Sequence, residues 1–187
     1  EVLSVANQDP YMRSHPLSRD RIRAAEAFVT SHGHTSAADP QAEYWFARIR
    51  GKLSAFKRAP KWSLRRAKEE PHRDIRLMRE AIAYHRRNDL QKALRGINGA
   101  LAIRPNDAFY HELKGQILFE NRRWNDAKNS FARAVQLAAS EPLVLASYGR
   151  AQLAAGAPTA ALKTMEKSRS LDFRNALLLR DMSQAYA

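Results

Sequence analysis

The sequence contains no cysteine, only 7 glycines and no long apolar run. Without cysteine the chain cannot form a disulfide, a thiolate metal site or a cysteine nucleophile. No stretch approaches the roughly 18 consecutive apolar residues of a membrane-spanning helix, and residues 1–4 lack the basic and apolar segments of a signal peptide. Because the chain does not begin with Met, we expect it to be part of a longer protein, whose missing part can carry a targeting segment.

The motifs of common enzyme classes are also absent. A zinc peptidase of the His-Glu-x-x-His type needs two His one helical turn apart with Glu between them. His111 and Glu112 open such a motif, but Gly115 stands where the second His is required. There is no glycine loop for phosphates and no recognisable frame for a Ser/His/Asp triad. We therefore expect no catalytic residue within this chain.

One histidine pair is a candidate metal site. His32 and His34 flank a glycine, and His72 or His85 could approach them in the fold. A loop without a carboxylate or thiolate ligand makes a poor site, however. We expect the chain to bind no metal and to need no cofactor.

Acidic residues are scarce relative to basic ones. The chain has 32 Lys and Arg against 19 Asp and Glu, a formal charge of +13. One interpretation is a helical repeat that binds nucleic acid, which predicts a continuous positive stripe and steep salt dependence. The other is a basic protein with charges spread over solvated helix faces. The densest basic segment contains Lys52, Lys57, Arg58, Lys61, Arg65, Arg66 and Lys68.

A 34-residue period runs through the second half of the chain. Ala93, Ala127 and Ala161 are each 34 positions apart. The same step links four further columns: Ala100, Ala134 and Ser168; Ile97, Phe131 and Met165; Ala81, Gly115, Gly149 and Ser183; Tyr84 and Tyr186, with Leu118 and Gln152 between them. Small residues allow two helices to approach closely, and bulky residues fill the space between neighbouring units.

Residues 74–187 resemble the tetratricopeptide repeat (TPR) family, whose repeat is 34 residues long. The resemblance implies an all-α solenoid of helical hairpins with three repeats, 74–107, 108–141 and 142–175, and a capping helix over 176–187. Polar or breaker segments at 87–89, 121–123 and 155–158 fit the turns within repeats. The second and third repeats lack the family's closing proline, and His111 and Leu145 stand where the family has Trp.

The segment before the repeats also has helical periodicity. We expect one helix over residues 18–31 and a second from Asp39-Pro40 to Phe56, together forming an additional hairpin that stacks on the first repeat. The apolar stripe of the second helix consists of Tyr44, Trp45, Ile49, Leu53 and Phe56. Residues 57–73 are a basic connector with one short helix, and residues 1–17 form an extended link.

Residues 14–22, Ser-His-Pro-Leu-Ser-Arg-Asp-Arg-Ile, resemble a segment that follows the catalytic domain in Oma-type and CAAX-protease-related zinc metallopeptidases. In the bacterial BepA-type branch this segment leads into TPR repeats, the order found here. The resemblance implies an upstream zinc peptidase in the periplasm, with zinc bound by the parent rather than by this chain. His15 would then lie near the peptidase cleft and Arg21 would anchor that loop. The alternative is an ordinary exposed loop at His15.

A TPR domain binds protein segments in its concave groove. By family position, the groove would be lined by His85, Arg86, Phe109, Glu112, Gln116, Phe119, Arg150 and Arg180. Phe109 and Phe119 can instead pack against the upstream hairpin. We therefore expect a non-catalytic interaction module that recruits a protein or peptide to an attached peptidase or gates that enzyme. The alternatives are a stand-alone TPR scaffold and the nucleic-acid binder; the latter is less favoured.

Overall fold

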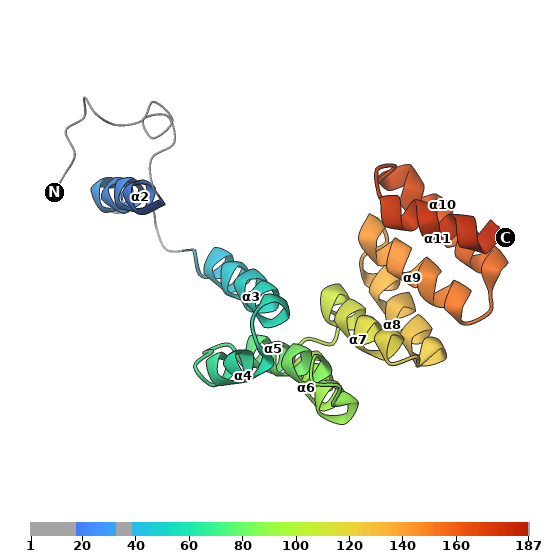
Figure 1. Cartoon of the computed structure of the whole chain (residues 1–187), viewed down its shortest axis with the longest axis horizontal. Coiled ribbons are helices and arrows are strands. Elements are labelled where there is room, and N and C mark those ends of the chain that lie inside the picture. The colour runs from blue at the N-terminus through green and yellow to red at the C-terminus, as the bar shows by residue number, and fades with distance from the viewer. Residues whose placement is uncertain (1–17, 33–38, 187) are drawn as a thin grey trace. The chain divides into compact units, whose positions relative to one another are not determined.

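The computed structural model describes residues 18–32 and 39–186, and every regular element within these ranges is a helix (Figure 1). The chain divides into two units, residues 1–43 and 44–187. The helices are α2 (Ser18–His32), α3 (Pro40–Lys57), α4 (Pro60–Lys68), α5 (Arg73–His85), α6 (Leu90–Ile103), α7 (Ala108–Glu120), α8 (Trp124–Leu137), α9 (Pro142–Ala154), α10 (Pro158–Leu171) and α11 (Ala176–Tyr186). None of these helices is both long and apolar enough to cross a bilayer.

The first unit contains α2 and the start of α3. Asp39 caps α3, because its Oδ1 accepts hydrogen bonds from the backbone N–H groups of Gln41 and Ala42. Both helices thus form where the sequence predicted them, whereas their pairing as a hairpin stays a prediction. His15 lies outside the described residues, and for Arg21 the structure describes the backbone alone.

In the second unit, three helix pairs repeat the same turn. Asn88, Arg122 and Gly156 follow the first helix of each pair, and each has a positive φ of 56°, 59° and 80° respectively. In each turn the N–H of the next residue bonds to a carbonyl five positions earlier, at 3.0 Å in all three cases. This left-handed residue ends a helix while pairing its last carbonyls. The 34-residue period of the sequence is therefore a period of backbone geometry.

Glycines allow the helices of a pair to approach closely. A Cβ atom on Gly115 would lie 2.8 Å from the ring of Phe131, and one on Gly149 would lie 2.6 Å from Cγ of Met165. Behind these contacts, the core is built from the small and apolar residues of the 34-residue columns, including Ala93, Ala127 and Ala161, each with no exposed surface.

Helix α3 packs on the first pair through an unexpected face. Of the predicted apolar stripe, Tyr44 is buried and Phe56 packs on the core, but Trp45, Ile49 and Leu53 are 39%, 65% and 55% exposed. The face that α3 buries consists of Tyr44, Arg48, Gly51 and Ala55. Gly51 allows this approach, because a Cβ there would lie 3.1 Å from Ile75 on α5. The predicted short helix of the basic connector is present as α4.

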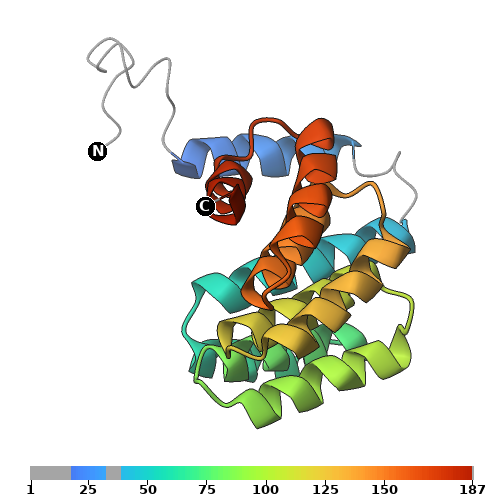
Figure 2. The same ribbon diagram turned by 90° about the vertical axis from the view of Figure 1, so that its right-hand side faces the viewer.

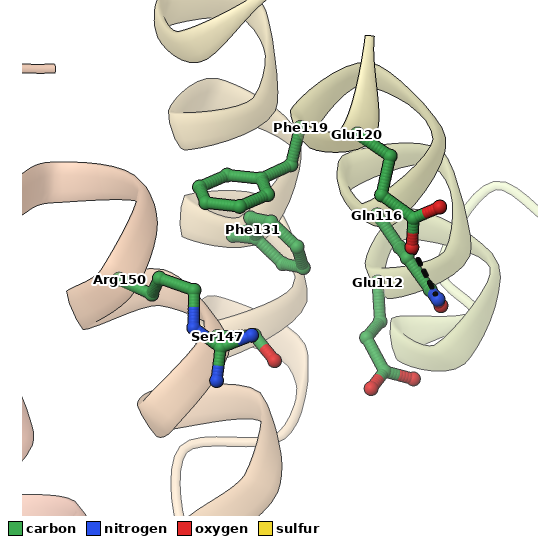
Figure 3. A pocket seen from close by; sticks show the side chains of 7 residues that line it. All are labelled: Glu112, Gln116, Phe119, Glu120, Phe131, Ser147 and Arg150. Atoms are coloured by element: carbon green, nitrogen blue, oxygen red, sulfur yellow. Dashed lines mark hydrogen bonds between the residues drawn. The ribbon is translucent and has the colours of Figure 1, made fainter. Parts of the chain in front are cut away.

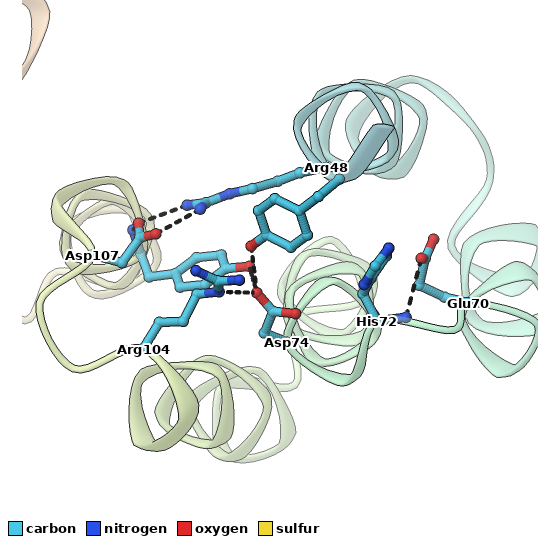
Figure 4. Close-up of polar contacts among 8 residues, drawn as sticks. Arg48, Glu70, His72, Asp74, Arg104 and Asp107 are labelled. Carbon is cyan, nitrogen blue, oxygen red and sulfur yellow. Dashed lines mark hydrogen bonds and ion pairs between the residues drawn. The ribbon is translucent and has the colours of Figure 1, made fainter. Parts of the chain in front are cut away.

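Buried polar contacts hold α3 against α5 and α7 (Figure 4). Asp74 on α5 accepts hydrogen bonds from the hydroxyls of Tyr44 and Tyr110, at 2.5 and 3.0 Å. Arg48 donates two bonds to Asp107, at 2.5 and 2.6 Å, and its guanidinium lies 4.0 Å from the centre of the Tyr110 ring. Burial raises the pKa of both phenols, so they remain protonated donors.

The last helix, α11, packs against α9 and α10, and Figures 1 and 2 both show the three together. Leu178 and Met182 of α11 join Met165, Ala161 and Ala146 in one buried cluster. The predicted all-helical architecture of stacked hairpins with a final covering helix is confirmed.

Candidate functional site

One cavity lies between α7 and α9 (Figure 3). It has a volume of about 280 Å³. Glu112, Gln116 and Glu120 reach it from α7 because they are four residues apart, so they share one helix face. Phe131 reaches it from α8, and the remaining lining residues are Phe119, Ser147 and Arg150. Opposite walls thus carry opposite charges, with aromatic rings between them.

The cation on the α9 wall is largely neutralised. Arg150 Nε donates to Asp181 Oδ2 at 2.5 Å, and the Asp181 side chain is only 4% exposed. Arg180 also donates to Asp181, at 3.0 Å. A buried carboxylate so close to the guanidinium offsets its charge at the cavity.

Of the two carboxylates on the α7 wall, that of Glu120 is the more exposed. Glu120 receives hydrogen bonds from Gln116 at 3.0 Å and from His85 Nε2 at 2.7 Å, and its side chain is 49% exposed. Glu112 lies 3.5 Å from Lys52, whose side chain is 39% exposed. The Lys52–Glu112 pair is long and partly exposed, so it contributes little, about 0–1 kcal/mol. The His85–Glu120 pair differs, because the His85 side chain is only 9% exposed. The α7 wall of the cavity therefore presents two carboxylates opposite the guanidinium of Arg150.

The sequence-predicted groove residues divide into two groups. Glu112, Gln116, Phe119 and Arg150 line this cavity together. His85 lies behind it and contacts it through Glu120. Arg86, Phe109 and Arg180 lie elsewhere. Ligand binding by all eight residues stays a prediction.

Arg86 donates to the backbone carbonyls of Ala55, at 3.0 Å, and of Arg58, so its guanidinium caps the C-terminal end of α3. Arg180 is on α11 and pairs with Asp181. Phe109 borders a second cavity of about 330 Å³ between α3, α5 and α7, where its neighbours are Trp45, Arg48, Ile49, Lys52, Met78, Tyr110 and Leu113. Phe109 remains 42% exposed there.

Sequence reasoning missed Glu120, Ser147 and Asp181. The repeat register contains a signal for Glu120, because it is 34 positions after Arg86, a predicted groove residue. Likewise, Arg150 is 34 positions after Gln116. No sequence signal indicates that Asp181 faces Arg150, since their contact depends on how α11 covers α9. Among the described residues, no group of three or more His, Asp or Glu is arranged to hold a metal ion.

Comparisons with known proteins support the fold. No protein-family model matches the sequence, and the search of curated proteins gives no match. Solved structures of TPR domains do match. The MamA RS-1 ArsTM double mutant superposes with a TM-score of 0.62 at 20% identity, covering 80% of this chain and 85% of that one. The chain therefore has the TPR fold.

Two similar structures contain bound peptides. The first TPR of Spaghetti (RPAP3), bound to the HSP90 peptide SRMEEVD, has a TM-score of 0.57 and 16% identity, covering 61% of this chain and 93% of that one. The second TPR domain of human RPAP3, in complex with the HSP70 peptide SGPTIEEVD, has a TM-score of 0.55 and 14% identity, covering 69% and 99%.

Proposed function

We propose that this chain is a protein-interaction module whose α7–α9 cavity binds a partner segment carrying a Lys or Arg beside an apolar residue. The observation that supports this proposal is the α7 wall, where Glu112 and Glu120 face the cavity while Arg150 is neutralised by Asp181. A basic side chain can pair with these carboxylates, and its apolar neighbour can cover Phe119. TPR structures with bound peptides make a peptide the natural ligand class for this fold.

The charge of the cavity argues against an acidic peptide of the kind bound in those two structures. An acidic peptide would have to compete with the existing partners of the nearby cations, and it would also face Glu112 and Glu120. In this chain His85 is paired with Glu120, Arg86 with backbone carbonyls and Arg150 with Asp181. We therefore expect the peptide SRMEEVD not to bind.

Selection from a library of displayed random peptides, followed by fluorescence anisotropy of the enriched sequences, tests this function. We expect enrichment of Lys or Arg next to apolar residues. The double variant Glu112→Gln/Glu120→Gln should bind them at least tenfold more weakly, because a hydrogen bond to a charged group contributes about 1.5–3 kcal/mol. Enriched peptides with acidic termini, or equal binding to this variant, would refute the proposed specificity.

Matched controls separate a local effect from a general change in charge. Glu141→Gln/Glu166→Gln removes the same charge from exposed residues that do not line the cavity, so it should leave peptide affinity unchanged. Thermal unfolding of both double variants, followed by circular dichroism, checks that they are folded.

We further propose, from the resemblance at residues 14–22, that the module serves an attached zinc metallopeptidase of the cell envelope. It would hold a substrate near the cleft, raising the local concentration, or gate access to it. Reading the sequence encoded upstream of Glu1 tests this: a signal peptide followed by His-Glu-x-x-His supports it, and the absence of any zinc motif leaves a stand-alone scaffold. Unchanged zinc-dependent proteolysis in a full-length His15→Ala variant would contradict a regulatory role for His15.

A further inference from the structure

Helix α3 exposes large apolar side chains on one face. Its opposite face is buried through Tyr44, Arg48, Gly51 and Ala55. Phe46, Ile49 and Leu53 are 64%, 65% and 55% exposed. Their spacing of three and four residues places them along one side of the helix. Exposed apolar residues that are scattered singly need no explanation, whereas a row of three on one helix face suggests an interaction surface.

The same segment is basic and has no acidic residue. Residues 44–68 include Lys and Arg at 9 positions, and the nearest carboxylates along the chain are Glu43 and Glu69. Within the described part of the chain, Arg48, Lys52 and Arg66 lie within 4 Å of a carboxylate. The others in this segment form no such ion pair and are all exposed: Arg50, Lys57, Arg58, Lys61, Arg65 and Lys68.

Two of these cations lie on the apolar face itself. Arg50 and Lys57 are four residues after Phe46 and Leu53 respectively, so each is on the same side of α3 as its apolar neighbour. The Arg50 guanidinium lies 5.4 Å from the centre of the Phe46 ring. Long basic side chains can lay their stems along apolar surface while the charge stays in a polar layer. The remaining cations follow in α4, which begins at Pro60.

Charge and shape narrow the choice of partner outside the chain; within the chain, the predicted hairpin would bring α2 to this face, and failure to bind vesicles would favour that arrangement. A second copy of this chain also carries a formal charge of +13, so repulsion opposes self-association through this face. A nucleic acid would pair its phosphates with the cations and stack its bases on aromatic rings, but the exposed aliphatic side chains of Ile49 and Leu53 offer neither contact. A bilayer rich in anionic lipid complements both features, because apolar side chains enter the headgroup boundary while Lys and Arg meet the phosphates.

We propose that the α3–α4 surface, formed by Phe46, Ile49, Leu53 and the exposed cations of residues 50–68, binds peripherally to anionic membranes. The proposal is independent of peptide binding in the α7–α9 cavity, since none of these residues lines that cavity. The helix lies on the bilayer surface, with its buried face still packed on α5 and α7. Binding depends on both charge and apolar insertion.

Sedimentation with vesicles tests the proposal. The full chain is mixed with vesicles of phosphatidylcholine alone or with about a third phosphatidylglycerol, and the bound fraction is measured. We expect binding to the anionic vesicles only, weakening as salt rises. Arg50→Gln/Lys57→Gln should bind about twenty-five-fold more weakly, from a factor of about five for each basic residue near the surface. Phe46→Ser/Leu53→Ser should bind about tenfold more weakly despite unchanged charge.

Matched variants outside α3 and α4 complete the test. Lys163→Gln/Lys167→Gln on α10 removes the same charge, and Leu143→Ser/Phe173→Ser replaces residues that are 62% and 71% exposed. Neither should weaken binding as much as its counterpart on α3. The proposal is overturned if anionic vesicles do not bind, if both charge variants weaken binding equally, or if Phe46→Ser/Leu53→Ser binds normally. Duplex or single-stranded DNA bound with the same dependence on Arg50 and Lys57, in the absence of vesicle binding, would assign the surface to nucleic acid instead.

Discussion

At the scale of single residues, Asp74 is a buried carboxylate that links α5 to α3 and α7. It is 5% exposed and accepts hydrogen bonds from Tyr44, Tyr110 and Arg104, the last at 2.7 Å. Burial by itself raises the pKa of Asp74, but these three donors outweigh it and hold the pKa below its ordinary value of 3.8. The ionised carboxylate is therefore the form that the fold stabilises.

We predict that Asp74→Asn lowers the free energy of unfolding by about 2–4 kcal/mol at neutral pH, because a neutral amide oxygen accepts more weakly from the three donors at Oδ2 and the charge opposite Arg104 is lost. A group with a lowered folded pKa stabilises the fold above its unfolded pKa, and this stability is lost as pH falls through the folded value. The difference between the wild type and Asp74→Asn should thus be largest above about pH 4 and shrink below it.

Urea unfolding at a series of pH values measures this difference. Asp126→Asn is the control, because its pair with Arg123 is exposed, with side chains 47% and 58% accessible. That substitution should change the free energy of unfolding by less than about 1 kcal/mol. A difference for Asp74→Asn that stays constant from pH 7 to pH 3 would show that its carboxylate is not the stabilising form.

The candidate site could be predicted only in part at this scale. The repeat register predicted Glu112, Gln116, Phe119 and Arg150, since a column of the repeat fixes which face of its helix a residue occupies. It could not predict that Asp181 neutralises Arg150, because the direction of a long side chain depends on its neighbours in space. Ligand binding by these residues stays a prediction.

At the scale of helices, two glycines in different surroundings should respond differently to the same substitution. Gly149→Ala would place Cβ 2.6 Å from Met165 Cγ and 3.3 Å from the Ala161 carbonyl, deep between α9 and α10. Gly99→Ala would meet only the Leu77 side chain, with its Cδ1 at 3.2 Å, which can move. Both changes gain up to about 1 kcal/mol of helix propensity.

We predict that Gly149→Ala destabilises the protein by about 1–3 kcal/mol, because overpacking outweighs the gain in propensity. Gly99→Ala, the matched control in α6, should be neutral or more stable. Thermal unfolding of both variants, followed by circular dichroism, compares them directly. Equal stabilisation by the two substitutions would show that α9 and α10 are not closely packed at this contact.

Helix α3 shows where prediction from sequence failed at this scale. Its existence followed from the cap at Asp39 and from apolar periodicity. Its orientation did not, because the face with the larger apolar side chains is exposed while Arg48 is buried. Buried Arg is uncommon without a partner, and that partner, Asp107, is 59 residues away in sequence. Hydrophobicity alone cannot predict which face such a helix buries.

At the scale of the whole molecule, stacked repeats make stability local. Each pair contacts its neighbours in the stack, so the free energy is approximately a sum of repeat and interface contributions. The clusters of buried residues follow this pattern. One cluster is formed by buried side chains between Tyr44 and Ile117, and another joins α9, α10 and α11. Damage at one end of such a stack should therefore unfold that end first.

We predict that Leu178→Ala, at a side chain 1% exposed, lowers the stability of α9–α11 by about 2–4 kcal/mol. Native-state hydrogen exchange should show faster exchange of amides in α9, α10 and α11, while α5 and α6 keep their protection. Leu179→Ala, at a neighbouring residue that is 45% exposed, is the control and should leave exchange unchanged. Because the α7–α9 cavity shares α9 and Asp181 with this end of the stack, Leu178→Ala should also weaken any ligand held by that cavity. Uniform loss of protection from α5 to α11 would instead show that the repeats unfold as one cooperative unit.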